Sequence, residues 1–537
     1  MLKKSIIHSI LISVVFVSSQ VFAEEEFIGV PIADEHGNET GTYNVNPDPY
    51  GEPWIVAPLE VTPEVQAKLD AIPEWEPDMS RALPVPPSVN HFREKEFRPI
   101  FSQKGGSCSA ASGTGYHYTW EANILTEADG ESNRSMYYYG YNFLNGGGSG
   151  GIWWYTAWDI MKKTGCVREA GWPSPLGSET TTEWAKTYEA YHNANFDRCS
   201  TYYKIEDPGT SDGLTKLKQW MYDHGKGDAK GGCVTFNAGT SFGIQTIPSG
   251  SAEAGSKIAT SFNGQSTIHA MMFAGYNDSV YYDSNRKGAV LLVNSWGTSF
   301  GDKGILWIPY HLLTSENYVH CLEVVKHVPR LEYKVKLQSY GKSGGKFTAG
   351  FSKSTSATNP DNTQDYGRAF SGNTGSFTGE IGLDCSTFWG EFAQNDATGT
   401  FFLQSSGSGT VLELSLMIYD NTGTTLLKEI KCDETGVSIG TTMKIVVENA
   451  VDIDLIAPKV TPALIKIRKL ANTYSVYVPF NNKSEVTVMD TKGRLLASFT
   501  ASSDEWHVIP ASLQSGLHIV AVRNGNTRYV EKLNCIW

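Results

Sequence analysis

The chain has 537 residues, of which 40% are hydrophobic and 12% aromatic, and a formal net charge of -13. At roughly 100–200 residues per domain this length predicts more than one domain, and the hydrophobic content excludes a disordered chain. The acidic balance argues against a nucleic-acid-binding protein, and 8 cysteines are too few for a small disulfide scaffold.

Residues 1–23 have the pattern of a secretory signal peptide. Lys3 and Lys4 precede an apolar stretch that ends at Ala23, a small residue suited to cleavage. An uncleaved membrane anchor is the alternative, but the stretch is short for a bilayer span, and no later run approaches about 18 apolar residues. We therefore expect an exported, soluble mature protein without a membrane span, in a compartment that permits disulfides.

Residues 24–82 form an acidic, proline-rich segment. They contain 14 acidic residues against Lys68 and Arg81. The only helical signal is at residues 63–69, where Pro63 suits a first helical position. We expect a loosely structured leader rather than a domain with its own core.

A cysteine with the features of a nucleophile follows a glycine-rich turn. Residues 102–112 read SQKGGSCSAAS, and residues 110–124 carry apolar side chains at near-helical intervals. A helix that begins at Cys108 would stabilise its thiolate, since the N-terminal end of the helix dipole is positive. A buried structural thiol is the alternative.

Two later strands supply candidate partners for this thiol. His269 lies at the start of a predicted strand over residues 268–276, and Asn294 ends a buried strand over residues 290–294. A cysteine nucleophile needs a base, and the base needs a third group to orient it. Cys108, His269 and Asn294 can fill these roles without a metal or cofactor, although a histidine in a strand can also be a plain core residue.

These motifs resemble those of the papain family of cysteine peptidases over about residues 83–328. The resemblance implies a two-lobed α+β fold, with a helical lobe and a β-barrel lobe. It implies that Gln103 belongs to the oxyanion hole and that Gly150, Gly151 and Trp296 bind substrate. The chain departs from the family pattern at Ser109, where a tryptophan is usual, and the gap between Gln103 and Cys108 is one residue short.

The same resemblance implies a free Cys108 and disulfides elsewhere in an exported enzyme. We expect bridges between Cys166 and Cys199 and between Cys233 and Cys321, although spacing alone fixes no connectivity.

Residues 329–455 show repeated strand signals separated by Gly and Ser, which predicts a β-sandwich. Nothing in this segment has catalytic spacing. It can bind a polymer or act as a spacer, and Cys385 can bridge to Cys432 within it.

Residues 456–537 predict a small all-β domain. The patterns at residues 490–496 and 513–522 resemble the C-terminal sorting domain of type IX secreted proteins. That resemblance implies a Gram-negative bacterium, contact with its outer-membrane secretion machinery, and an extracellular or cell-surface location. Another sandwich domain is the alternative.

Together these features predict a secreted papain-like cysteine endopeptidase that acts on proteins or peptides. The leader would keep it as a zymogen. The alternatives are a catalytically inactive relative that binds surfaces and an adhesion protein whose β domains define its role.

Overall fold

The computed structural model describes residues 44–47, 53–56, 61–145, 150–264, 268–313, 319–372 and 374–448, and a set of strands between residues 466 and 535. The chain divides into two compact units, Met1–Glu448 and Asn449–Trp537. Each is described by itself.

The first unit contains all of the described helices. They are α2 (Pro63–Asp70), α3 (Cys108–Ala110), η2 (Ala111–Tyr118), α4 (Thr119–Thr126), α5 (Tyr138–Leu144), α6 (Trp154–Thr164), α7 (Tyr188–Ala194), α8 (Ser211–Asp223) and α9 (Trp389–Gln394), with short 3-10 turns η1 (His91–Arg93), η3 (Glu169–Gly171), η4 (Tyr310–Leu312) and η5 (Ser386–Phe388). None of these helices has the length and apolar character needed to cross a membrane.

A nine-stranded sheet forms the centre of residues 83–328. Its strand order is β4-β11-β5-β8-β9-β10-β7-β6, with β3 paired to β8. The strands are β3 (Ser88–Asn90), β4 (Asp197–Ile205), β5 (Val234–Ala238), β6 (Phe242–Thr246), β7 (Lys257–Phe262), β8 (His269–Tyr281), β9 (Lys287–Val293), β10 (Ile305–Pro309) and β11 (Val319–Lys326).

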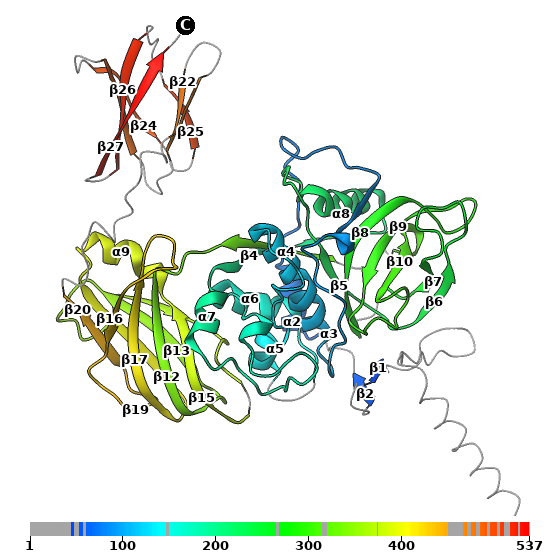
Figure 1. Cartoon of the computed structure of the whole chain (residues 1–537), viewed down its shortest axis with the longest axis horizontal. Helices are drawn as coiled ribbons and strands as arrows, with labels where there is room; N and C mark the ends of the chain where they lie inside the picture. The colour runs from blue at the N-terminus through cyan, green and yellow to red at the C-terminus, as the bar shows by residue number, and fades with distance from the viewer. Residues whose placement is uncertain are drawn as a thin grey trace, which may run out of the picture. The chain divides into compact units, whose positions relative to one another are not determined.

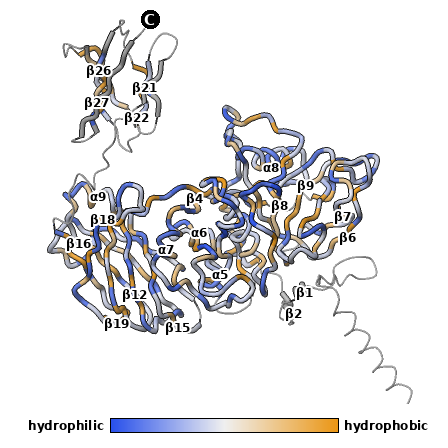
Figure 2. Tube along the Cα trace, viewed as in Figure 1, coloured by the Kyte–Doolittle hydropathy of each residue, from blue (hydrophilic) through white to orange (hydrophobic). Residues whose placement is uncertain are grey.

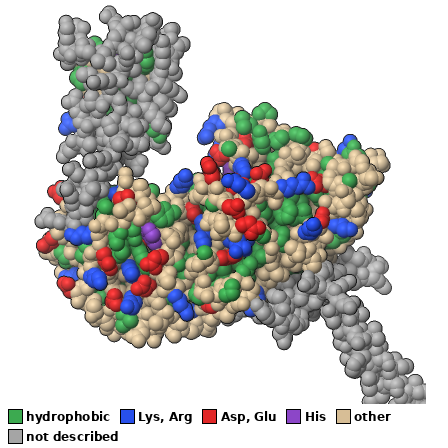
Figure 3. All heavy atoms as spheres, in the orientation of Figure 1, with side chains coloured by type: hydrophobic (Ala, Val, Ile, Leu, Met, Phe, Trp, Pro, Cys, Tyr) green, Lys and Arg blue, Asp and Glu red, His purple; other side chains and the backbone are tan. Residues whose placement is uncertain are grey.

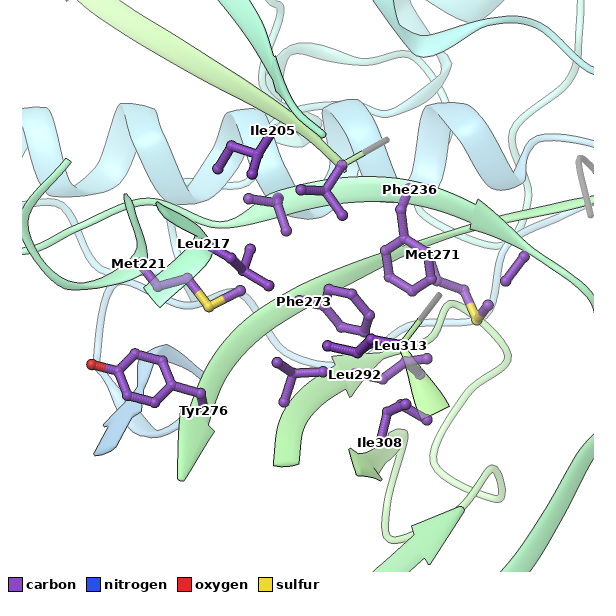
Figure 4. Close-up of a cluster of buried hydrophobic side chains, with 14 of the residues drawn as sticks. Ile205, Leu217, Met221, Phe236, Met271, Phe273, Tyr276, Leu292, Ile308 and Leu313 are labelled. Atoms are coloured by element: carbon purple, nitrogen blue, oxygen red, sulfur yellow. The ribbon is translucent and has the colours of Figure 1, made fainter. Parts of the chain in front are cut away.

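One hydrophobic core of this region lies between the sheet and α8. Figure 4 shows Leu217 and Met221 of α8 pointing toward Phe236, Phe273 and other strand side chains. Leu214, Leu217, Trp220 and Met221 recur at helical spacing, which places them on one face of α8. Burial of such side chains stabilises the fold by roughly 1.5–3 kcal/mol each.

The helix that begins at Cys108 runs without a break through α3, η2 and α4. Its residues from Cys108 to Asn123 are all buried. Glycine permits this close packing at Gly113, where an added Cβ would lie 2.6 Å from the Cβ of Trp154 in α6. The helices therefore pack closely enough to hold Cys108 in a fixed position (Figure 1).

Residues 331–447 form two further sheets that pack face to face. One has the order β15-β12-β17-β18 with β19 on β17, and the other β14-β13-β16-β20. The strands are β12 (Leu331–Gly341), β13 (Lys346–Ser352), β14 (Asn362–Asp365), β15 (Ser376–Asp384), β16 (Gly399–Ser406), β17 (Thr410–Tyr419), β18 (Leu426–Lys431), β19 (Val437–Ser438) and β20 (Met443–Val447). Tyr333 of β12 donates a hydrogen bond to the carbonyl of Phe402 in β16, 3.0 Å away, across the two sheets.

The described residues thus form a mixed α+β protein with several β-sheets, as predicted. Figure 2 shows short hydrophobic and hydrophilic stretches alternating along the sandwich strands, as expected for strands with one buried face. On the face shown in Figure 3, acidic and basic side chains of the first unit are interspersed rather than gathered by sign.

Residues 61–82 differ from the loosely structured leader that their composition predicted. Helix α2 is capped by Thr62, whose side chain accepts a hydrogen bond from the N–H of Val65. Further on, Trp75 is buried in the core beside Trp220 of α8, with ring centroids 5.4 Å apart. A few apolar anchors are enough to hold this segment in place, although acidic residues and prolines surround them. We call residues 61–82 the N-terminal strap. Strands β1 (Asn44–Pro47) and β2 (Pro53–Val56) precede it.

The second unit contains only strands among its described residues. They are β21 (Lys466–Lys469), β22 (Tyr474–Val478), β23 (Ser484–Asp490), β24 (Leu495–Ala501), β25 (Glu505–Val508), β26 (Gly516–Asn524) and β27 (Thr527–Cys535). Its core includes Val476, Val478, Val486, Val488 and Val520. The alternating residues in the sequence had indicated several of these strands.

The expected disulfides are absent from the described part of the chain. Cys108, Cys166, Cys199, Cys233, Cys321, Cys385 and Cys432 are all buried free thiols. A buried thiol acts as a small hydrophobic group, and Cys166 also lies 3.5 Å from the carbonyl oxygen of Val167. The export pattern permits bridges, but these side chains serve as core packing instead.

Candidate active site

A tight loop presents Cys108 at the start of its helix. We call residues 103–107 the nucleophile loop. Gly105 has a φ of 63°, a left-handed conformation that favours glycine. The Ser107 hydroxyl donates to the carbonyl of Lys104 at 2.7 Å. Cys108 follows as the first residue of α3, with 6% of its surface exposed.

The nucleophile loop is tied to the segment that carries Asn294. The N–H of Gln103 donates to the carbonyl of Ser295 at 2.7 Å. The Ser295 hydroxyl donates to Oε1 of Gln103 at 2.6 Å, and Nε2 of Gln103 donates to the carbonyl of Gly105 at 2.9 Å. These bonds orient the Gln103 amide group, with one of its N–H bonds directed to Gly105.

His269 and Asn294 meet because β8 and β9 pair antiparallel. Met272 lies opposite Val293, so the start of β8 lies beside the residues that follow β9. Nε2 of His269 is 2.8 Å from Oδ1 of Asn294. That oxygen also accepts the N–H of Ser295 at 2.8 Å. Because an amide oxygen only accepts hydrogen bonds, Nε2 carries the proton and Nδ1 is the basic nitrogen.

Trp296 covers this histidine. Its ring stacks on the His269 imidazole with centroids 4.5 Å apart and an interplanar angle of 20°. Both side chains are buried. Shielding from water strengthens the bond between His269 and Asn294. The geometry therefore gives Trp296 a contact with His269; the resemblance had implied a contact with substrate.

Cys108 lies against the start of β8. Burial raises the pKa of its thiol, while hydrogen bonds from the backbone of Ala270 and Ser109 act in the opposite direction. Burial lowers the pKa of His269 to about 4, with the Asn294 hydrogen bond opposing that shift. Both directions favour a neutral thiol and a neutral imidazole. Desolvation is the larger effect on Cys108, so its thiol pKa is raised here and not lowered as the helix dipole alone would predict.

Gly150 and Gly151 lie before α6, in an open part of the structure. Gly150 is exposed, and a Cβ added there would meet no atom within 4 Å. Its carbonyl accepts a hydrogen bond from the Tyr141 hydroxyl at 2.8 Å. Tyr141 belongs to α5, and burial raises its pKa, so its hydroxyl stays protonated and can donate to the Gly150 carbonyl.

Tyr141 and Ser295 belong to the site, although the sequence did not single them out. Tyrosines recur at residues 137–141, but only tertiary contacts show which of them reach the site. Ser295 likewise follows Asn294 without any signal of its bond to Gln103.

Among the described residues, no group of three or more His, Cys, Asp or Glu is arranged to hold a metal ion. The residues that the structure does bring together are Cys108, Gln103, His269, Asn294 and Trp296.

No protein-family model matches the chain, and no curated protein matches it. Among solved structures it is similar to the bromelain protease of Ananas comosus, with a TM-score of 0.30 and 16% identity over 44% of this chain and 99% of that one. It is similar to the digestive procathepsin L2 proteinase of Tenebrio molitor, with a TM-score of 0.35 and 15% identity over 58% of this chain and 88% of that one. Xylellain, a cysteine protease from Xylella fastidiosa, gives a TM-score of 0.31 and 16% identity over 51% of this chain and 96% of that one.

Proposed function

We propose that the chain is a papain-like cysteine endopeptidase, with Cys108 as nucleophile, His269 as base and Asn294 as the group that orients the base. The observation that carries the proposal is the buried hydrogen bond of 2.8 Å between His269 and Asn294, formed where β8 meets the N-terminal end of the Cys108 helix. The Asn294 oxygen that binds His269 is itself held by the N–H of Ser295. A histidine that only filled the core would not need a partner oriented in this way.

The first half of the reaction forms an acyl-enzyme. Nδ1 of His269 takes the thiol proton as Sγ of Cys108 attacks the peptide carbonyl carbon. The backbone N–H of Cys108 and the amide of Gln103 stabilise the oxyanion, at about 2.7–4 kcal/mol for each donor. The C–N bond then breaks, and His269 returns the proton to the leaving amine.

The second half restores the enzyme. His269 takes a proton from water, and the hydroxide attacks the thioester carbonyl. The C–S bond breaks, the product leaves as a carboxylic acid, and Cys108 regains its proton. Trp296 shields His269 from water in both half-reactions. Gly150 and Gly151 would line the substrate cleft, where an exposed backbone can approach an extended peptide.

The proposal includes the fate of the protein in the cell. The pattern of residues 1–23 supports export, and the acidic leader supports a zymogen. The β-strand unit from residue 456 to 537 would direct the enzyme to the secretion machinery of a Gram-negative outer membrane. Its substrates would be proteins or peptides outside the cell or at its surface.

Replacement of the nucleophile tests the proposed function. Cys108→Ala is expected to abolish hydrolysis of a peptide library and labelling by a thiol-reactive epoxide, while the unfolding temperature stays near that of the wild type. Cys432→Ala is the matched control, because Cys432 is about as buried, at 7% against 6%, but belongs to the sandwich.

The control variant should keep both activities. Hydrolysis by Cys108→Ala would refute the assignment. A wild-type protein that takes the label at Cys108 but cleaves no peptide would favour the inactive surface-binding relative.

A further inference from the structure

Two neighbouring tyrosines hold the two peptide groups on either side of the Cα of Lys104 in the nucleophile loop. The Tyr137 hydroxyl accepts the N–H of Lys104 at 3.2 Å. The Tyr138 hydroxyl donates to the carbonyl of Lys104 at 2.9 Å. Tyr137 caps α5 and Tyr138 is its first residue, so one end of a helix fixes the residue between Gln103 and Gly105.

A buried carboxylate fixes the direction of the Tyr137 hydroxyl. Because this oxygen already accepts from Lys104, its proton must go to another acceptor, and it is donated to Oε1 of Glu179. Glu179 is fully buried. Burying a carboxylate is costly unless hydrogen bonds compensate, so leucine would fill this space at lower cost. Packing alone does not account for the residue type.

Glu179 is itself held against α5. The backbone carbonyls of its neighbour Thr180 and of the nearby Glu183 both accept hydrogen bonds at 2.8 Å from Nδ2 of Asn142, a buried residue of α5. The segment that carries Glu179 and the helix that carries Tyr137 are therefore joined at two points.

We propose that Glu179 is a positioning residue for the reaction. It acts through Tyr137 and the Lys104 peptide on the nucleophile loop, and so sets the position of the Gln103 amide relative to the N–H of Cys108. These are the two donors of the proposed oxyanion hole, so the inference rests on the proposed function. Their spacing decides how well they meet an oxyanion that exists only during the reaction.

Kinetics of full-length Glu179→Leu, Glu179→Gln and Tyr137→Phe test this role. Glu179→Leu removes the acceptor, and we expect kcat to fall about 10- to 100-fold with little change in KM. Glu179→Gln keeps an acceptor oxygen and should recover most of kcat. Tyr137→Phe should resemble Glu179→Leu, and the double variant should be no worse than either, because both changes break the same connection.

Tyr188→Phe is the matched control. Tyr188 also donates to a fully buried carboxylate, that of Glu332, but it joins α7 to the sandwich strand β12. We expect this variant to lower the unfolding temperature and leave kcat unchanged. Wild-type kcat in folded Glu179→Leu and Tyr137→Phe would overturn the inference, as would an equal loss of kcat in Tyr188→Phe.

A second measurement separates this inference from the proposed function. The rate of Cys108 alkylation by iodoacetamide needs no peptidase activity and should rise several-fold in Glu179→Leu, since a loosened loop exposes the thiol. If the wild type cleaves no peptide, the proposed function fails. An unchanged alkylation rate in Glu179→Leu would refute the link between Glu179 and the nucleophile loop, whether or not the wild type is active. If Glu179→Leu does not fold, Tyr137→Phe, which keeps the ring and removes only the hydroxyl, carries the same test.

Discussion

At the scale of single residues, His224 is a buried histidine that carries a charge. It caps α8 in a left-handed conformation, with φ of 52°. Nε2 lies 3.1 Å from Oε2 of Glu121, and Nδ1 lies 3.0 Å from Oδ2 of Asp228. Burial alone would lower the pKa, but the charge of Glu121 and the hydrogen bond to Asp228 outweigh it and raise the pKa of His224 to about 9.

This shift predicts a pH-dependent stability. The folded pKa lies above the unfolded value of about 6.5, so the stabilisation is complete below that pH and is lost as the pH rises toward 9. The unfolding temperature should therefore decline between pH 6.5 and 9, and the decline should be smaller in His224→Gln. His311, whose pKa burial lowers, gives the control variant His311→Gln, which should keep the wild-type slope. An equal slope in His224→Gln would contradict the prediction.

The sequence indicates those residues of the candidate site whose residue type itself suggests a chemical role. It does not indicate residues whose role depends on which side chains they contact in the fold. Cys108, His269 and Asn294 follow from the chemistry of a nucleophile, a base and an orienting group. Glu179 lies in a polar stretch of Ser and Thr, where a solvated carboxylate is the ordinary expectation. Its burial arises only when α5 folds against residues 177–183, and local sequence contains no signal for that contact.

At the scale of elements, the sandwich shares a core with the helices. Tyr188, His192 and Asn195, from α7 and the residue after it, all donate to the buried carboxylate of Glu332 in β12. Nearby, Arg198 of β4 pairs with Asp384 of β15 at 3.0 Å. A spacer domain would not need buried ion pairs with its neighbour.

Phe370 is the hydrophobic part of this interface. It is fully buried with a φ of 60°, an unusual conformation for a bulky residue. Its ring lies 5.4 Å from those of Phe143 in α5 and Tyr191 in α7. Aromatic contacts on both sides of the Phe370 ring stabilise this strained backbone conformation.

Phe370→Ala is expected to lower the free energy of unfolding of the first unit by about 3–5 kcal/mol, the usual range for a phenylalanine lost from a core. Residues 61–448 should unfold in one urea transition, which the variant shifts as a whole. Leu426→Ala, at a side chain 43% exposed, should change the free energy by less than about 0.5 kcal/mol. Separate transitions for the sandwich and the helices would contradict this prediction.

The elements themselves follow from sequence pattern more reliably than their partners do. The strand signals of residues 329–455 and 456–537 predicted β domains, and strands such as β17, β20 and β22 lie there. The same patterns did not reveal that the sandwich and α7 share a core, because buried polar contacts such as those of Glu332 leave no periodicity in the chain.

At the scale of the whole first unit, the N-terminal strap is part of the folded body. The N–H of Trp75 donates to the carbonyl of Lys204 in β4 at 2.8 Å. Lys216 of α8 pairs with Glu74 at 2.7 Å and with Glu76 at 2.6 Å. These contacts lie on β4 and α8, and Lys68 of α2 also pairs with Asp159 of α6 at 2.8 Å.

The position of the strap predicts where maturation cleaves the chain. Removal of residues 61–82 would expose the core around Trp220, so the N-terminus of the processed enzyme should precede residue 61. N-terminal sequencing of the active form checks this expectation. Trp75→Ala should also lower its unfolding temperature, whereas Met79→Ala, at a side chain 76% exposed, should not. An active form that begins at Leu83 would contradict the prediction.

The seven buried free thiols have a consequence for the redox behaviour of the proposed peptidase. The proposed nucleophile acts only while it is reduced, and strained or exposed disulfides are open to the same reductants. Here the described fold depends on none. A reducing environment can therefore restore an oxidised nucleophile without loosening the scaffold that positions it.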